Sequence, residues 1–352
     1  MALRTGTHDM AFLLAAKDQT VVEIGVDTVA QILAEDNANH NALVTEALSD
    51  LTTTSTDRQR RQGTSVDGDM LEADEYSRIP TQRATAGQLV GFPLRKYQFA
   101  LGWTRDWERK RTAADFAIAQ QAAQQADLRR IRFELLKAIF TPTNYTFTDA
   151  LVDQADIPVK ALINADGAGI QNGPNGESFD GATHSHYNAN ATLTAAAVQA
   201  TIDDVVEHGY GGDVRVYINR ADEAAFRALT GFVGYIDSRL TLNANANQPE
   251  SRLDITRMDN REIGIFGAAR VFVKPWIPAN YLLAFDASTP SKPLVMRAPT
   301  DGAGLQVVAD LETFPLRAQY MQREFGFGAW NRTNGAVLRF NNASYAAPTL
   351  TL

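Results

Sequence analysis

Apolar positions recur at helical spacing near the start of the chain, after about 20 residues that show no sustained period and are expected to form an N-terminal arm. Between residues 26 and 51 the apolar side chains fall largely on one face of a helix, and Asp27 is the expected N-cap. These positions are Val29, Ile32, Leu33, Leu43, Val44, Ala47, Leu48 and Leu51. The pattern predicts one amphipathic helix.

Residues 52–104 show a different pattern. The stretch 52–65 contains no apolar residue, so it cannot contribute to a core and is expected to project from the body. Farther on, apolar residues at the odd positions from Tyr97 to Trp103 alternate with polar or small ones, which indicates a strand with one apolar face. We therefore expect residues 52–104 to form a long hairpin-like excursion.

A long helix is predicted next. Residues 113–140 contain neither Gly nor Pro, and Thr112 with Asp115 three positions later resembles a capping box. Pro142 ends the pattern. At 1.5 Å per residue the helix is about 42 Å long, which exceeds the length of most globular helices.

The rest of the chain alternates between loops and short elements. Residues 141–190 are rich in Gly, Asn and Asp, which is typical of a loop-rich domain entry. A helix is expected from Thr194 to Gly209, then a strand at 214–218 and a short helix capped by Asn219. Further strand patterns lie at 262–266, 269–274, 281–285 and 305–340.

Within the last of these segments, Asn334 and Gly335 offer the positive φ angles that a tight hairpin turn needs. Helices and strands segregate along the chain rather than alternate. The predicted fold class is therefore α+β.

Composition narrows the class of protein. The chain has 352 residues, of which 45% are hydrophobic and 21% charged, as expected for a globular protein of about two domains. It has no cysteine, which excludes disulfides, a thiol nucleophile and cysteine-ligated metals. No apolar stretch is long enough for a membrane helix, and residues 11–16 are too short for a signal-peptide core, so a soluble cytosolic chain with no membrane partner is the default expectation. The net charge of −8 argues against a main task of clamping nucleic acid.

Candidate chemistry is sparse. His184 and His186 would share one face of a strand and so begin a metal site, but the sequence identifies no third ligand, and a solvated loop is the preferred interpretation. The glycines between 167 and 181 are not followed by the Lys-Ser/Thr of a phosphate loop. Hydrolase and metalloprotease motifs are also absent. No catalytic residue, cofactor or metal site is predicted; an enzyme with a site carried on loops is the alternative from another class.

Arginine supplies 26 of the 33 basic residues. Interface pairing favours arginine, and a GC-rich genome gives the same bias, so both explanations stay open. Basic residues gather near both ends of the long helix, where pairing with acidic groups of other helices or subunits is preferred over nucleic-acid contact. The candidate intersubunit contacts are Arg58, Arg60, Arg61, Arg78, Arg83, Arg105, Arg109, Arg129 and Arg130.

The order of these elements resembles the major capsid proteins of tailed bacteriophages with the Hong Kong 97 fold. Residues 192–229, which include His208-Gly209-Tyr210 and the strand ending at Asn219, look like the core of the family's axial domain. Residues 262–285 are similar to its strand, turn, strand unit. Residues 323–332 and 335–340 look like the paired closing strands of its peripheral domain.

The resemblance implies a division of the chain into five parts. Residues 1–51 are the N-terminal arm and helix, and residues 52–104 are the extended loop, a long β-hairpin that overlaps a neighbouring subunit. Residues 105–144 hold the spine helix of the peripheral domain. Residues 145–300 form the axial domain, and residues 301–352 provide the closing strands of the peripheral domain and the C-terminus.

The resemblance also implies a function and partners. Hexamers and pentamers of the chain are expected to form the icosahedral shell of a virion, assembled in the host cytoplasm around double-stranded DNA that it does not bind strongly. The chain lacks the charged N-terminal scaffolding segment of some relatives, so a separate scaffolding protein is expected, with a portal and in some cases a decoration protein. The alternative is an encapsulin compartment of the same fold.

Some relatives weld subunits through a lysine in the extended loop. Within residues 52–103 the only lysine is Lys96, which lies near the base of the loop. Guanidinium groups stay protonated and cannot act as the nucleophile. The shell is therefore expected to be non-covalent.

Overall fold

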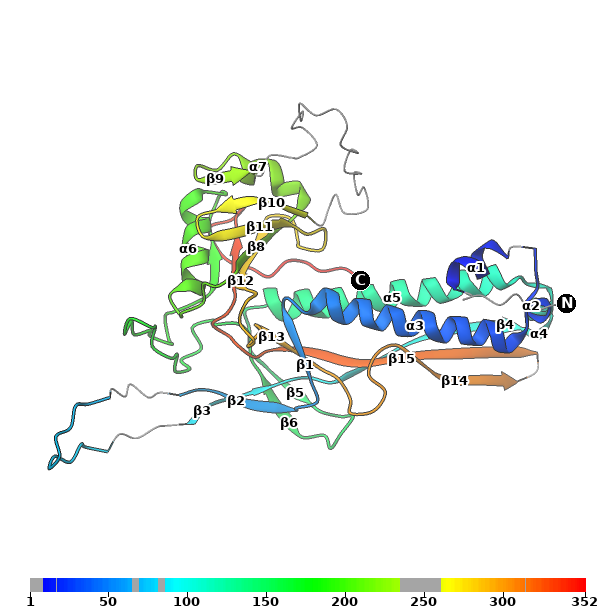
Figure 1. Cartoon of the computed structure of the whole chain (residues 1–352), viewed down its shortest axis with the longest axis horizontal. Coiled ribbons are helices and arrows are strands. Elements are labelled where there is room, and N and C mark those ends of the chain that lie inside the picture. The colour runs from blue at the N-terminus through cyan, green and yellow to red at the C-terminus, as the bar shows by residue number, and fades with distance from the viewer. Residues whose placement is uncertain (1–8, 17, 65–69, 82–85, 235–260, 314) are drawn as a thin grey trace.

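Two sheets and a pair of long helices organise the chain (Figure 1). The computed structural model describes residues 9–16, 18–64, 70–81, 86–234, 261–313 and 315–352. Both helices and strands contribute to its core, as the predicted α+β class requires. No helix in these ranges is long and apolar enough to cross a bilayer.

The first sheet has five strands and lies beneath the long helices (Figure 1). Its centre is β15, which pairs antiparallel with β4, β13 and β14, while β1 pairs parallel with β13. The strands are β1 (Thr52–Ser55), β4 (Arg95–Thr104), β13 (Leu294–Arg297), β14 (Gln306–Thr313) and β15 (Leu316–Ala329). Alternate residues of β4 turn inward, as the sequence pattern predicts.

Helices α3 (Val26–Leu48) and α5 (Ala113–Phe140) run side by side over this sheet (Figure 1). Their apolar faces and the end of β15 share one core, to which Val44, Ile131, Leu135 and Phe325 belong. The short helices α1 (Met10–Ala15), α2 (Val21–Ile24) and α4 (Arg105–Lys110) lie at the far end of the pair.

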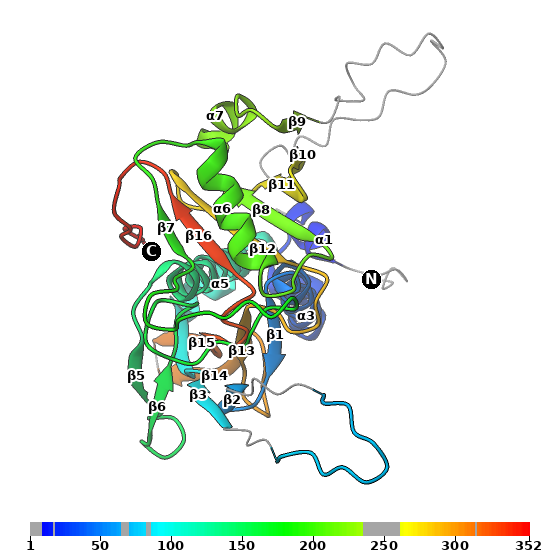
Figure 2. The same ribbon diagram turned by 90° about the vertical axis from the view of Figure 1, so that its left-hand side faces the viewer.

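The second sheet has seven strands in the order β7-β16-β12-β8-β11-β10-β9, and α6 (Ala195–Val206) lies across one face of it (Figure 2). Its strands are β7 (Tyr187–Ala189), β8 (Val214–Ile218), β9 (Phe232–Gly234), β10 (Arg261–Phe266), β11 (Ala269–Val273), β12 (Tyr281–Asp286) and β16 (Ala336–Arg339). The short helices η1 (Arg220–Asp222) and α7 (Glu223–Arg227) follow β8. A second apolar core fills the space between α6 and the sheet, with Ile202, Val216 and Leu338 among its members.

Two hairpins complete the fold. Strands β2 (Gln59–Thr64) and β3 (Ala86–Gly91) pair antiparallel and lead away from the body, and residues 70–81 lie at the far end of this excursion (Figures 1 and 2). Strands β5 (Tyr145–Thr148) and β6 (Asp156–Val159) pair beside its base. We call the described residues of this excursion, 59–64, 70–81 and 86–91, the projecting hairpin.

The local sequence signals of several elements are confirmed. Helix α5 has the predicted bounds, and the Asp115 carboxylate accepts a hydrogen bond from the Thr112 N–H at 3.2 Å. Helix α6 is capped by Thr194, whose hydroxyl accepts from the Ala197 N–H, and Gly209 follows it with φ of +86°. Strand β8 and the Asn219 cap are also where the sequence predicts them.

Two predictions near the start of the chain are wrong. The N-cap of α3 is Gly25, with φ of +104°, and Asp27 lies in the first turn of the helix. A positive φ lets Gly25 turn the chain sharply between α2 and α3, which leaves no extended position for a capping side chain. Leu43, expected on the apolar face of this helix, is 65% exposed.

The expected hairpin turn at Asn334 and Gly335 is also wrong. Strand β16 pairs with β12 and β7 in the seven-stranded sheet, whereas β15 belongs to the other sheet, so the two are not paired closing strands. The connection between them is a buried crossover. The Asn334 side chain holds it by accepting from the Asp286 N–H at 2.8 Å and donating to the Asp286 carbonyl at 3.0 Å.

Candidate assembly surfaces and a buried histidine cluster

The base of the projecting hairpin is tied to the body by Arg58. Its guanidinium donates to both carboxylate oxygens of Asp153 at 2.8 Å and to the Ala155 carbonyl at 3.2 Å. The hydrogen bond from Arg58 lowers the pKa of Asp153. Arg58 therefore fixes the direction in which the hairpin leaves the body.

A second, buried ion pair lies under this contact. Asp149 is fully buried, and its Oδ2 lies 2.8 Å from Nη1 of Arg297 and 3.4 Å from Nε of Arg58. The same Arg297 nitrogen also donates to the Phe92 carbonyl, just after β3. The buried pair joins β13, the β5–β6 hairpin and the base of the projecting hairpin.

Arg60 and Arg61 also have contacts within the chain. Arg60 donates to Asp57 and Ser55, and its guanidinium lies 5.2 Å from the ring centroid of Trp330. Arg61 donates to the Gly87 carbonyl across the hairpin at 3.4 Å. Both residues stabilise the hairpin's first strand.

The other predicted contact arginines are scattered. Arg78 is exposed near the end of the hairpin, and Arg129 is exposed on α5. Arg130 lies 3.3 Å from Glu134 and covers the ring of Tyr97 at 4.7 Å. Arg83 and the side chains of Arg105 and Arg109 lie outside the described residues.

A buried polar network joins the two long helices to the sheet. Asp127 of α5 contacts His40 of α3 at 2.9 Å and accepts from Nε of Arg323 of β15 at 2.8 Å. Arg323 also donates to the side chain of Asn41 at 2.6 Å. Because the network joins α3, α5 and β15, it sets how the helices lie on the sheet.

Strand β14 presents an apolar surface that the sequence analysis did not single out. It ends the five-stranded sheet, and seven of its eight residues are exposed. Val307 and Val308 are each 47% exposed and Leu311 is 54% exposed. An edge strand with exposed apolar side chains is a ready surface for another chain.

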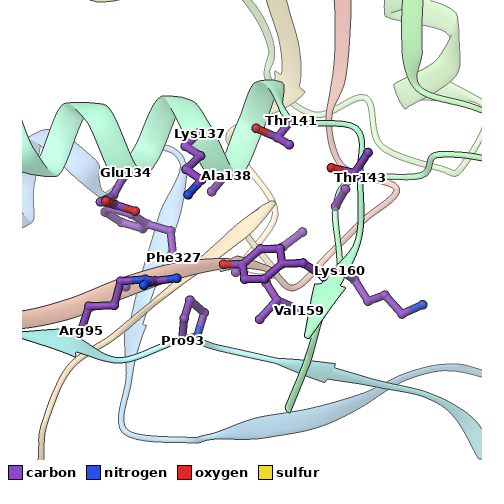
Figure 3. Close-up of a pocket in the computed structure, with 15 residues that line it drawn as sticks. Pro93, Arg95, Glu134, Lys137, Ala138, Thr141, Thr143, Val159, Lys160 and Phe327 are labelled. Atoms are coloured by element: carbon purple, nitrogen blue, oxygen red, sulfur yellow. The ribbon is translucent and has the colours of Figure 1, made fainter. Parts of the chain in front are cut away.

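A cavity of about 300 Å³ lies between α5, β15 and the β5–β6 hairpin (Figure 3). Glu134 and Lys137 reach it from α5, and Arg95 lines the opposite side (Figure 3). Among the lining residues Glu134 is the only carboxylate, and Lys160 is bound to Asp166 at 3.0 Å.

Three of the five histidines converge at the end of α6. The Nε2 atoms of His184, His186 and His208 lie 3.1 to 3.2 Å from one another, and Oε1 of Glu207 lies 3.3 Å from that of His184. His186 is fully buried, and the side chains of His208 and His184 are 3% and 18% exposed. We call these four residues the histidine cluster.

Burial lowers the pKa of each imidazole in the histidine cluster. Burial and the neighbouring His208 lower the pKa of His186, and burial lowers the pKa of His208 to about 4. The interpretation of His184 and His186 as a solvated loop is therefore wrong. His208 is the third possible ligand that the sequence did not identify. It lies near His184 and His186 because α6 ends beside the start of β7.

No known protein family and no curated protein sequence matches the chain. Several solved structures match it in fold. A structure described as Mycobacterium phage Patience is 19% identical over 99% of this chain and 96% of that chain, with a TM-score of 0.68. The mature capsid of bacteriophage PhiM1 is 11% identical over 83% of this chain and 85% of that chain, with a TM-score of 0.48. The capsid of a native GTA particle is 13% identical over 85% and 91%, with a TM-score of 0.47. The last two of these structures are capsids, and the chain has the fold of the phage Patience structure over almost its whole length.

Proposed function

We propose that the chain is the major capsid protein of a tailed phage, which assembles into the icosahedral shell around double-stranded DNA. The observation that carries this proposal is the projecting hairpin on a fold shared with the phage Patience structure. A polar excursion buries little surface in a single subunit, so ordering it is costly until a neighbour covers it. The role is structural rather than catalytic.

The division of the chain follows from this proposal. Residues 52–104 are the extended loop, although β1 at its start and β4 at its end are built into the five-stranded sheet. The expectation that the whole stretch 52–65 projects from the body is wrong for Thr52–Ser55, because their backbone pairs with β13 and Thr52 is buried. Helix α5 within residues 105–144 is the spine. Residues 145–300 are the axial domain, except that β13 belongs to the five-stranded sheet. Residues 301–352 return to the peripheral domain, except that β16 joins the axial strands. Residues 1–51 form the N-terminal arm and helix.

Two surfaces are proposed to make the subunit contacts. The first is the exposed end of the projecting hairpin, including Arg78. The second is the apolar edge strand β14, whose backbone groups on one side are available for another chain. Arg58, Arg60 and Arg130 have partners within the chain, so their part in subunit contacts is to orient these surfaces.

The proposed partners are further copies of the chain in hexamers and pentamers, a separate scaffolding protein, a portal and a decoration protein. The shell forms in the host cytoplasm and becomes part of the virion. The net charge of −8 opposes strong binding of DNA, so the shell encloses the genome without condensing it.

Negative-stain microscopy and sedimentation of the purified chain test this proposal. Rings, capsomers or closed shells are expected, with nucleic acid inside particles taken from infected cells. A chain that stays monomeric at every concentration, both alone and with its scaffolding protein, would contradict it. Shells that hold a cargo protein and no DNA would instead establish the encapsulin alternative.

A second experiment tests the hairpin itself. All residues from 70 to 81 are exposed, so replacing them with a short Gly-Ser linker should leave the circular dichroism and Tm of the subunit unchanged. The variant should fail to form closed shells. Normal shells from the shortened chain would show that the hairpin is not an intersubunit element.

A further inference from the structure

Four side chains at the end of α6 present the donor atoms of a metal site. Their ligand atoms all lie within 4.8 Å of one another. Three are imidazole nitrogens and one is a carboxylate oxygen, a donor set that suits a borderline cation such as Zn²⁺. We propose that His184, His186, His208 and Glu207 bind one zinc ion per chain.

The spacing of the nitrogens fits this ion. Ligands about 2.05 Å from a tetrahedral zinc ion lie about 3.3 Å from one another. The three Nε2 atoms are 3.1 to 3.2 Å apart, so an ion placed just out of their plane reaches all three with small adjustments. Glu207 lies on the side of His184 and supplies the fourth position.

Hydrogen bonds alone cannot satisfy the three nitrogens. In each contact one Nε2 must carry the proton and the other must offer a lone pair. Each Nε2 either carries a proton or offers a lone pair, so at least two of the three atoms are in the same state. Those two atoms repel each other, because two donors or two acceptors face one another. An ion at the centre accepts all three lone pairs and removes the conflict.

The surroundings place the lone pairs where the ion needs them. The Nδ1 of His186 lies 2.8 Å from the Gly335 carbonyl and donates to it, so its Nε2 is unprotonated when the ring is neutral. A hydrogen bond of this kind orients a metal-binding histidine. The ring of Phe179 covers His208 at 4.3 Å and His184 at 4.9 Å.

The electrostatics also favour a cation. Glu207 is the C-cap of the 12-residue helix α6, so the negative end of the helix dipole faces the cluster. Its Oε1 is buried and accepts no hydrogen bond among the described residues. The nearby positive group, Arg332, is neutralised by Asp166 at 3.2 Å.

The ion would cross-link two separate segments of the chain. His184 and His186 end the Gly- and Asn-rich segment before β7, while Glu207 and His208 end α6. In a chain without cysteine, this link replaces the staple that a disulfide supplies elsewhere. Zinc should therefore stabilise the seven-stranded sheet and the loop that enters it.

The test uses the full chain stripped with a chelator and titrated with ZnCl₂ in a calorimeter. One ion per chain is expected, with a rise in Tm of about 3–5 °C at a free zinc concentration of about 100 Kd. Cobalt in place of zinc should give the intense visible bands of a tetrahedral site. Zinc retention well below one ion per chain, or an octahedral cobalt spectrum, would overturn the proposal.

Variants distinguish the cluster from other weak sites. His208→Gln and His184→Gln should each weaken binding by more than about 100-fold, and Glu207→Gln by about 10-fold or more. Asp203→Asn is the matched control, because it removes the same charge from α6 four residues earlier, where the side chain binds Gln199. It should change Kd little.

His184 is the most exposed of the three histidines, so His184→Gln keeps the test valid if the more deeply buried variants fail to fold. The folding of each variant is checked by its Tm in chelator, which should match that of the stripped wild type. Equal zinc affinity in His184→Gln and wild type would refute the assignment. His8 and His40 remain in every variant and control for adventitious binding.

Discussion

Substitution Asp149→Asn tests whether the buried ion pair under the projecting hairpin stabilises the body. Asp149 is fully buried, and its partner Arg297 is 5% exposed. Asparagine keeps the shape of the side chain and the backbone turn in which the Asp149 carbonyl accepts from the N–H groups of Val152, Asp153 and Gln154. The substitution removes the negative charge and replaces one acceptor oxygen with an amide donor.

The expected loss follows from the burial of the partner that remains. Removing one member of a buried ion pair costs about 3–5 kcal/mol, because the other charge is left uncompensated. Native domains are stable by about 5–15 kcal/mol, so the loss is a large part of the total. Asp153→Asn is the matched control. It removes a negative charge from the side chain that pairs with Arg58, but that side chain is 51% exposed, and exposed ion pairs contribute little to stability.

Urea unfolding of dissociated subunits, followed by circular dichroism, measures both variants. The double variant Asp149→Leu with Arg297→Met should recover most of the stability, because two apolar side chains can replace a buried ion pair at little cost. A loss for Asp149→Asn no greater than that for Asp153→Asn would refute the reasoning. It would mean that water reaches Arg297 in solution.

Three further predictions follow from the same structure. Leu311→Lys should leave the subunit folded, because Leu311 is 54% exposed, but it should prevent the formation of shells, as measured by sedimentation. Gln306→Lys on the same strand is the control and should still form shells. Burial raises the pKa of Asp204 from 3.8 to about 7 in the folded chain, so the unfolded chain loses this proton at a lower pH. The free energy of unfolding therefore falls as the pH rises from 3.8 to 7. In urea unfolding, Asp204→Asn should be more stable than wild type above pH 7 and no more stable below pH 3.8. Boiling assembled particles in detergent should release one band at 38.5 kDa, because Lys96 lies 3.6 Å from Glu324 within the sheet rather than at the hairpin tip; a ladder lost in Lys96→Ala would contradict this.

The elements that could be predicted from the sequence carry their signals within a few residues. Helix α5 begins at the capping box of Thr112 and ends before Pro142, and no other part of the chain is needed to place those ends. The same holds for α6 between Thr194 and Gly209. The alternation in β4 also predicts which side chains turn inward, since one face of that strand packs against the core.

The elements that could not be predicted depend on contacts far apart in the chain. Asn334 and Gly335 have the composition of a hairpin turn, but the bonds from Asn334 to Asp286 make a crossover between sheets. The histidine cluster was missed for the same reason, because 22 residues separate His186 from His208. An H-x-H pair before a strand, with Glu-His at the end of the next helix, is the signal that would have found it.

The excess of arginine over lysine has a physical cause in the body of this protein. Arg297, Arg323 and Arg332 are 5%, 5% and 0% exposed, and each binds at least two acceptors. Those of Arg297 and Arg323 come from two separate segments of the chain, whereas those of Arg332 all lie within residues 161–166. A planar guanidinium with five donors can do this, whereas an ammonium group offers three donors at one point and is costly to bury. Because these charges are satisfied inside the subunit, they are not available to neighbours. Contacts between subunits must then depend on exposed groups, which directs mutagenesis to β14, Arg78 and Arg129 before the buried arginines.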